Sequence, residues 1–333
     1  MIGVAIIGTG YMSEVFAGII NRLQNARLVA VHNRNEEKGK IFAERFDTKH
    51  YKDFDHLLLN NEIKAIAVCT PTNTHFEIVC KAANAKKNIF CEKPIAFSVK
   101  EADEMINILK KNKVKGMIGH VLRFMPEYVV AKKVIESGKT GNVLSIFCER
   151  LVVIPKWSGW YAKEEYTKGA ALDLQVHDID YLVYILGKPK SIMSAGVYDK
   201  DLGGYAQINT ILEFQGKEIG LIDAGWMVKG KFPFTSVLRI ICEKGTIEWI
   251  FRGGDNIEKR GLKKPLVIYK MNGEIVSINT NDEDGFYLEW KYFIDCLDND
   301  KEIRNATFQD SRLALKIALA SIRSAREGKK IYL

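Results

Sequence analysis

The stretch Val4-Ala5-Ile6-Ile7-Gly8-Thr9-Gly10-Tyr11-Met12-Ser13 decides the fold of this chain. Four apolar residues lead into a glycine-rich turn, and apolar residues then recur at helical spacing, at Val15, Phe16, Ile19, Ile20 and Leu23. This order predicts a strand, a tight turn and a helix whose N-terminal backbone N–H groups face a pyrophosphate. Gly8 makes the turn, Gly10 leaves room for the phosphates, and Ser13 allows close helix–strand packing. The stretch therefore predicts a dinucleotide site, although glycine turns also serve plain strand-to-helix connections.

Length and composition are those of an ordinary globular protein with two domains. The 333 residues are 47% hydrophobic and 27% charged. Met1 opens the first strand directly, which predicts that no signal peptide precedes it, and no apolar run approaches the ~18 residues of a membrane span. The six cysteines form no CxxC pair, which argues against a disulfide framework or a zinc site. We expect a cytoplasmic protein that uses no metal and binds no membrane.

The net charge of +8 does not by itself indicate nucleic-acid binding. The lysines are dispersed, and the densest clusters, at 110–113 and 263–264, are interpreted as solvated surface. We expect no nucleic-acid partner. A basic field would still attract phosphate-bearing cofactors and anionic small-molecule substrates.

The first 120 residues alternate between strand and helix patterns. After the first strand and helix, the predicted strands are 28–31, 65–69, 89–91 and 116–119, and the predicted helices are 36–46, 76–85 and 99–111. This alternation predicts a doubly wound, mostly parallel sheet of the Rossmann type. Ligands of such sheets bind beyond the carboxyl ends of the strands. We therefore expect a dinucleotide-binding domain over residues 1–120.

The remainder, residues 121–333, has the pattern of a second α/β domain. Helices are predicted at 126–137, 171–186, 286–299 and 308–328, a strand at 143–153, and seven further β-type runs between 191 and 279. We expect a large, mainly antiparallel open sheet with helices on one face, which binds substrate; the terminal helix could pack back on the first domain. Because there are too few helices to cover both faces, the open face predicts a homodimer or homotetramer.

Asn33 and Arg34 follow the second predicted strand, about 20 residues beyond the glycine turn. Many NAD sites place an acid there to bind the ribose 2′-hydroxyl. Neutral Asn33 removes the repulsion toward a 2′-phosphate, and Arg34 can bind that phosphate or stack on adenine. The pair therefore favours NADP(H), with NAD(H) as the other possibility, unless it is a loop pair that touches no cofactor.

Two further segments follow strand ends in the first domain. Thr70-Pro71-Thr72-Asn73-Thr74-His75 follows Cys69, at the edge expected near the nicotinamide ribose, although Thr72 or Asn73 could simply cap the next helix. Glu92-Lys93-Pro94 follows the fourth strand. A partly desolvated lysine there can exchange a proton near neutrality, whereas taken alone it would be interpreted as a surface lysine.

The strongest local pattern in the second domain is Asp173-Leu174-Gln175-Val176-His177-Asp178-Ile179-Asp180. Asp173 and His177 are four residues apart and so share a helix face, which Asp180 extends. An aspartate beside a histidine orients the imidazole and raises its basicity, which suits proton transfer. The same spacing could ligate a metal, but no third ligand stands at helical spacing, and a plain surface pair is the other alternative.

Together these motifs resemble the Gfo/Idh/MocA family of nicotinamide-dependent oxidoreductases, over essentially the whole chain. The order and spacing of the motifs are specific, whereas no single motif is. The family pairs a Rossmann domain with an α/β domain on a large open sheet that often forms an oligomer interface. Its members oxidise a secondary alcohol on a sugar, polyol or related compound, or run the reverse reaction.

The resemblance implies roles for individual residues. Lys93 and His177 would handle the substrate proton, Asp173 would bind substrate or support His177, and Asp180 would be a further polar group of the pocket. The implied cofactor-contact residues are Gly8, Thr9, Gly10, Tyr11, Met12, Asn33, Arg34, Cys69, Thr70, Pro71, Thr72, Asn73, His75, Glu92, Lys93 and His120. Two departures from the family matter: Asn33 replaces the frequent acid, and Lys168-Gly169-Ala170 stands where many relatives have a Ser/Gly-rich turn.

Aromatic and basic residues near the domain crossing complete the candidate site. Trp157 and Trp160 could line a carbohydrate pocket or pack within their loop. His120 and Arg123 lie just past the closing strand of the first domain, where they could contact nicotinamide or substrate or form a structural hinge. Two other functions stay open: a nicotinamide-binding sensor without turnover, and an NAD-assisted glycosidase.

Overall fold

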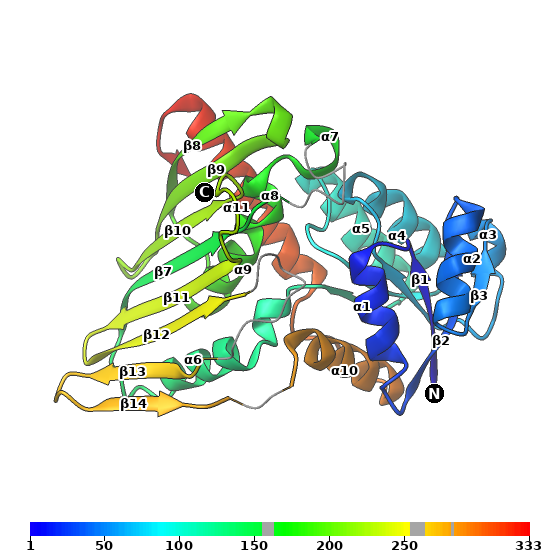
Figure 1. Ribbon diagram of the computed structural model, residues 1–333, viewed down its shortest axis with the longest axis horizontal. Helices are drawn as coiled ribbons and strands as arrows, with labels where there is room; N and C mark the ends of the chain where they lie inside the picture. Colours follow the sequence, from blue (N-terminus) through cyan, green and yellow to red (C-terminus); the bar gives the residue numbers. More distant parts are fainter. Residues whose placement is uncertain (155–162, 254–263, 281–282) are drawn as a thin grey trace. The chain divides into compact units, whose positions relative to one another are not determined.

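The computed structural model describes residues 1–154, 163–253, 264–280 and 283–333 (Figure 1). Within these ranges the chain forms two compact units. The first comprises residues 1–124 with 283–312, and the second comprises residues 125–282 with 313–333. Residues 283–312, which a boundary at residue 120 would give to the second domain, therefore belong to the first unit.

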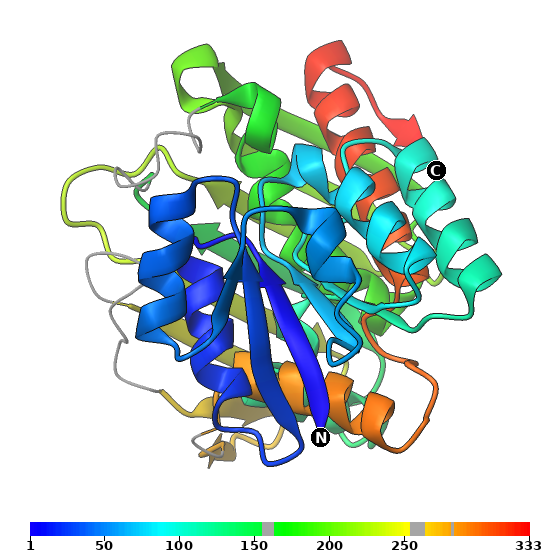
Figure 2. The ribbon, with the colours of Figure 1, turned by 90° about the vertical axis from the view of Figure 1, so that its right-hand side faces the viewer.

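The first unit is built on a six-stranded sheet in the order β3-β2-β1-β4-β5-β6, and every pairing in it is parallel. Its strands are β1 (Ile2–Ile7), β2 (Ala26–His32), β3 (Lys49–Tyr51), β4 (Ala65–Val68), β5 (Asn88–Cys91) and β6 (Gly116–Ile118). The central strands are short and almost wholly buried because helices lie on both faces (Figure 2). The predicted Rossmann arrangement is confirmed.

The helices of the first unit include one that returns from the end of the chain. They are α1 (Tyr11–Ile20), α2 (Glu36–Arg45), α3 (Phe54–Leu58), α4 (His75–Asn84), α5 (Val99–Asn112) and α10 (Gly285–Asp298). Trp290 of α10 stacks on Phe90 of β5, with ring centroids 4.4 Å apart, and lies 5.3 Å from Phe16 of α1. These buried aromatic contacts hold α10 against the sheet.

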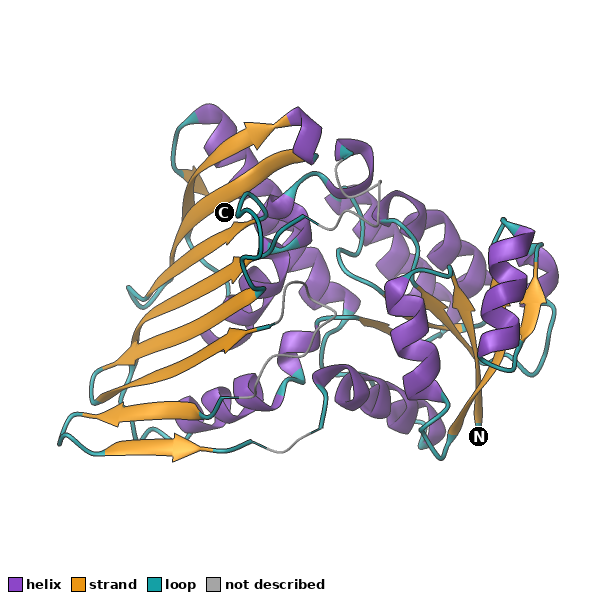
Figure 3. Cartoon of the chain, in the orientation of Figure 1, coloured by secondary structure: helices purple, strands orange, loops and turns teal. Residues whose placement is uncertain are grey.

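The second unit is built on a nine-stranded sheet in the described residues, in the order β14-β13-β12-β11-β7-β10-β9-β8-β15 (Figure 3). Its strands are β7 (Val143–Leu151), β8 (Ser191–Asp199), β9 (Gly204–Glu213), β10 (Ile219–Gly225), β11 (Thr235–Cys242), β12 (Gly245–Arg252), β13 (Leu266–Lys270), β14 (Ile275–Ile278) and β15 (Ile331–Tyr332). Among these described strands, only the β7–β10 pairing is parallel. The expected large, mainly antiparallel sheet is confirmed.

Helices cover one face of this second sheet. They are α6 (Pro126–Glu136), α8 (Ala170–Asp173), α9 (Gln175–Leu186) and α11 (Phe308–Glu327), of which residues 308–312 belong to the first unit. The short α7 (Glu164–Thr167) packs on α8. The single helix predicted over 171–186 is wrong: the structure has two, α8 and α9, separated at Leu174. No described helix of either unit is both long and apolar enough to cross a membrane.

Candidate functional site

The glycine turn between β1 and α1 requires glycine at position 8 and leaves space at position 10. Gly8 has φ +108°, and a Cβ there would lie 2.8 Å from the Cys69 carbonyl oxygen. Gly10 precedes α1 in an extended conformation, and no side chain caps the helix. A Cβ on Gly10 would meet no atom within 4 Å, so open space adjoins the chain at this residue. This arrangement fits a bound pyrophosphate.

Asn33 ties the end of β2 to the glycine turn. Its Nδ2 donates to Thr9 Oγ1 at 2.6 Å, and its Oδ1 accepts from the Asn35 backbone N–H at 2.8 Å. The side-chain amide is thus engaged on both atoms within the chain, whereas neighbouring Arg34 is exposed. Arg34 therefore presents its guanidinium group to solvent, whereas the Asn33 amide is held within the chain.

The loop after β4 is held by its own side chains rather than by helix capping. Thr72–Thr74 form a 3-10 turn, and Thr74 Oγ1 lies 2.7 Å from both Thr70 Oγ1 and the Pro71 carbonyl oxygen. The suggested capping by Thr72 or Asn73 is not observed, since Thr74 stands at the N-terminus of α4 and makes no side-chain cap.

His75 joins this loop to the one that follows β5. It is 1% exposed, and its Nδ1 and Nε2 lie 3.0 and 2.8 Å from the carbonyl oxygens of Pro94 and Thr70. Burial lowers the pKa of its imidazole, against the opposing effect of these carbonyls. His75 therefore orients two loops that both carry predicted cofactor-contact residues.

Lys93 stands directly beyond the end of β5. Its backbone N–H donates to Glu92 Oε2 at 3.1 Å, its side chain is half-buried, and the Lys93–Pro94 peptide is cis. Glu92 is 9% exposed. The carboxylate of Glu92 thus fixes the backbone from which the candidate catalytic lysine extends.

His120 and Arg123 are both buried in the first unit. Arg123 is 4% exposed, and its Nη1 lies 3.2 Å from Asp310 Oδ2 and 3.4 Å from Asn305 Oδ1. These contacts join the end of β6 to the returning 283–312 segment, which favours the structural alternative for Arg123. Contact of either residue with substrate or nicotinamide stays a prediction.

In the second unit, Asp173 and His177 lie on either side of the α8–α9 junction. Leu174 N–H still donates to the Ala170 carbonyl, but His177 N–H donates to the Leu174 carbonyl at 3.2 Å, a spacing of three residues instead of four. Asp173 and His177 are half-buried, and Asp180 is 1% exposed. Trp157 and Trp160 lie outside the described residues.

Buried polar contacts fix α9 in place. Asp178 accepts from Arg150 Nε at 2.9 Å and Nη2 at 2.8 Å, a bidentate pair between α9 and β7. Gln175 Nε2 donates to Thr210 Oγ1 at 2.6 Å, and its Oε1 accepts from Ser321 Oγ at 2.8 Å. Sequence reasoning missed Arg150 and Gln175; the signal was a carboxylate, Asp178, beside an apolar helix stripe, which requires a buried cation.

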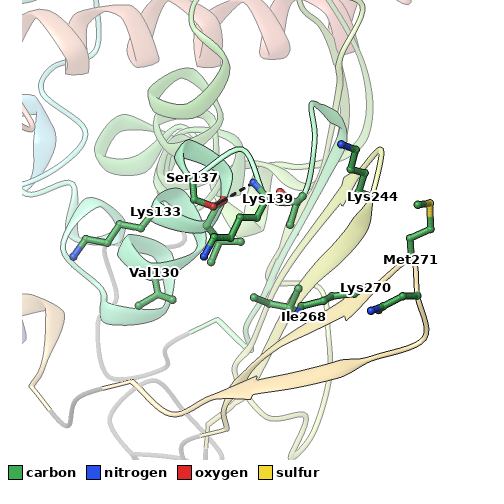
Figure 4. A pocket seen from close by; sticks show the side chains of 11 residues that line it. Val130, Lys133, Ser137, Lys139, Lys244, Ile268, Lys270 and Met271 are labelled. Carbon is green, nitrogen blue, oxygen red and sulfur yellow. Dashed lines mark hydrogen bonds between the residues drawn. The ribbon is translucent and has the colours of Figure 1, made fainter.

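The second unit also has a hollow of about 500 Å³ between α6 and β13 (Figure 4). Its lining includes Lys133, Lys139, Lys244 and Ile268. None of the predicted site residues lines this hollow, so it does not mark the candidate site. Within the described residues, no group of three or more His, Cys, Asp or Glu could hold a metal ion.

Comparison with known proteins identifies the class to which this fold and these motifs belong. Residues 2–120 match the model of an oxidoreductase family with an NAD-binding Rossmann fold, and residues 128–248 match the Gfo/Idh/MocA C-terminal domain. The chain belongs to the Gfo/Idh/MocA oxidoreductase family.

Individual relatives agree with this assignment. The 2,7-anhydro-N-acetylneuraminate hydratase of Mediterraneibacter gnavus is 33% identical over 204 residues, which are 59% of this chain and 52% of that protein. The chain thus spans about half the length of this relative. The inositol 2-dehydrogenase of Rhizobium meliloti is 25% identical over 98% of this chain and 97% of its own length.

A solved structure shares the fold. That of a putative NADPH-dependent oxidoreductase from Desulfitobacterium hafniense superposes with a TM-score of 0.88 at 21% identity. The match covers 99% of this chain and 97% of the other.

Proposed function

We propose that this protein is an NAD(P)-dependent dehydrogenase or reductase. It transfers a hydride between the nicotinamide and a secondary alcohol or carbonyl carbon of a sugar, polyol or related small molecule. The observation that carries this proposal is the placement of Lys93 in an NAD-binding family fold. Lys93 extends from the carboxyl edge of the parallel sheet that also bears the glycine turn.

The residues of the first unit fit the cofactor. The uncapped N-terminus of α1 suits a pyrophosphate, and the β4 loop, held by Thr74 and His75, offers its polar groups at the same sheet edge. When bound, the nicotinamide supplies the hydride acceptor or donor, and the protein supplies position and proton transfer.

Proton transfer is assigned to Lys93 and His177. Oxidation of a secondary alcohol removes a hydride from carbon and a proton from the hydroxyl oxygen. Lys93 or His177 accepts that proton and returns it in the reverse direction. Asp173, four residues before His177 and on the other side of the α8–α9 junction, orients the imidazole or binds a substrate hydroxyl. Asp180 contributes a polar group of the substrate pocket.

For the cofactor, we propose that NADP(H) is preferred over NAD(H). No carboxylate stands at position 33 to repel a 2′-phosphate, and Arg34 presents an exposed guanidinium beside the end of β2. Arg34→Ala should weaken NADP(H) much more than NAD(H), whereas Arg27→Ala, at the other end of β2, should change neither. Titration of both cofactors tests this: tighter NAD(H) binding by the wild type, or equal weakening by Arg34→Ala, would contradict the preference.

We further propose a homodimer or homotetramer formed through the open face of the second sheet. Five apolar side chains on β8, β9, β10 and β11 are 41–50% exposed: Met193, Val197, Ile211, Ile219 and Ile241. Strand register places Met193 beside Ile211, and Ile211 beside Leu221, on one face. Ile211→Glu should dissociate the oligomer in sedimentation experiments, and a wild type that is monomeric at high concentration would refute the proposal.

For the location, we propose the cytoplasm. All six cysteines are free, which fits a reducing compartment. Fractionation of cells that express the tagged protein would test it.

A reaction without net redox change is the second candidate, because one relative is a hydratase. A panel of polyols, sugars and anhydro sugars distinguishes the two. The dehydrogenase proposal predicts stoichiometric change in nicotinamide absorbance with product formation. Product formed from any panel member with no net absorbance change would favour the alternative, and no turnover with bound cofactor would favour a sensor.

A further inference from the structure

Glu289 is a fully buried carboxyl group in the cofactor-binding unit. It lies in α10 with 0% exposure, and both carboxyl oxygens are inaccessible to solvent and have no hydrogen-bond partner among the described residues. An ionised carboxylate in such surroundings would be very costly, because no donor among the described residues compensates its charge. Burial, and secondly the charge of Glu92, raise the pKa of Glu289 far above its usual range.

The surroundings of Glu289 connect it to the candidate catalytic lysine. Three ionisable groups interact electrostatically with Glu289: Glu92 at the end of β5, Asp284 at the start of α10, and Cys69 at the end of β4. Burial raises the pKa of the Cys69 thiol, which therefore carries no charge. The Glu92 carboxyl group lies beside Gly119 at the end of β6, where a Cβ would be 3.4 Å from its Oε1.

We propose that Glu289 is an uncharged carboxylic acid that leaves Glu92 as the single negative charge of this carboxyl pair, and that it thereby positions Lys93. Glu92 Oε2 accepts the Lys93 backbone N–H at 3.1 Å. A second negative charge at Glu289 would repel the Glu92 carboxylate from this place. Glu289 is thus a positioning residue that acts through Glu92, and none of its atoms needs to contact substrate or cofactor.

The charge state of Glu289 is testable without any enzymatic assay. A protonated carboxylic acid has an infrared carbonyl band that ionised carboxylates lack. At neutral pH the wild type should show this band, Glu289→Gln should lose it, and Glu302→Gln should keep it, because Glu302 is exposed. A wild type with no such band, or a band that persists in Glu289→Gln, would overturn the proposal.

The positioning role rests on the proposed function and has its own readout. As pH rises, Glu289 ionises, and the kcat of the wild type should fall. The ionisation of Glu289 should account for part of this fall on the alkaline side of the pH profile. Glu289→Gln cannot ionise, so at the wild-type alkaline midpoint it should keep about twofold more of its own neutral-pH kcat. Superimposable pH profiles would refute the positioning role. If no substrate is turned over, the infrared result still decides the charge state, so the two failures are distinguishable.

Discussion

The two units position their candidate site residues by different means. In the first unit the decisive contacts are local: Gly8 turns the chain directly after β1, and Lys93 follows β5 by two residues. In the second unit, α9 is fixed by partners far along the chain, Arg150 in β7 and Ser321 in α11. The arrangement in the first unit can therefore be predicted from short motifs. The arrangement in the second unit depends on contacts between residues far apart in the sequence.

Because of this difference, we expect the two units to respond differently to substitutions. The glycine turn loses its conformation when a residue within the turn is replaced. In contrast, α9 loses its position when a residue in a distant strand is replaced. The first candidate site should thus be sensitive mainly at its own motif residues. The second should be sensitive at Arg150 and Gln175, which touch no substrate in our proposal.

The largest effect should come from the proton-transfer residues themselves. Lys93→Ala and His177→Ala should each lower kcat by about 10²–10⁴-fold, because each removes a general acid–base group. Cofactor dissociation constants should change far less. Lys100→Ala, on the exposed side of α5, is the control and should be unaffected. Full activity in both variants would show that neither Lys93 nor His177 transfers the substrate proton.

The free energy of unfolding should show how strongly α9 depends on its distant contact with Arg150. Arg150→Ala should reduce the free energy of unfolding by about 3–5 kcal/mol, because it leaves Asp178 charged and buried. Arg304→Ala, whose ion pair with Glu302 is exposed, should cost less than about 1 kcal/mol.

Urea denaturation gives the free energy of unfolding of the Arg150→Ala and Arg304→Ala variants. The joint replacement Arg150→Met with Asp178→Leu should recover much of the loss, since no unpaired charge then remains. Equal, small effects of the two arginine variants would mean that the buried pair does not fix α9.

The smallest expected effect concerns the open face of the second sheet. Burial, and then the charge of the neighbouring Asp223, raise the pKa of Glu149. In the window above its ordinary pKa of about 4.3 the folded state therefore binds more protons than the unfolded state, and stability falls as pH rises. Glu149→Gln should gain stability relative to the wild type across this window, by less than about 1 kcal/mol, because the site is partly exposed. Parallel Tm–pH curves would contradict this.

The elements that sequence patterns predicted are those whose information is local. Strong alternation placed β1, β4 and β5 within one or two residues, because buried parallel strands read as apolar runs. β3 was missed because Lys49-His50-Tyr51 is short and mostly polar. The α8–α9 junction was missed because the apolar period continues through Leu172 and Val176, and one altered hydrogen bond leaves no mark on that period.

The candidate site divides in the same way. The motif residues of both units could be named from the sequence, because each follows a strand end or stands at helical spacing. The groups that hold them could not: Arg150 and Glu289 are distant in sequence from the residues they support. Asp178 beside an apolar helix stripe indicates that some cation is buried near it, but the sequence does not show that this cation is Arg150.

The central proposal is that Lys93 of the first unit and His177 of the second act on the same substrate proton. A double-mutant cycle on kcat, with Lys93→Ala, His177→Ala and their combination on one confirmed substrate, tests it most directly. If the two groups serve one step, the combined variant should lose little more than the worse single variant. Losses that multiply would show that they act independently and would contradict the account.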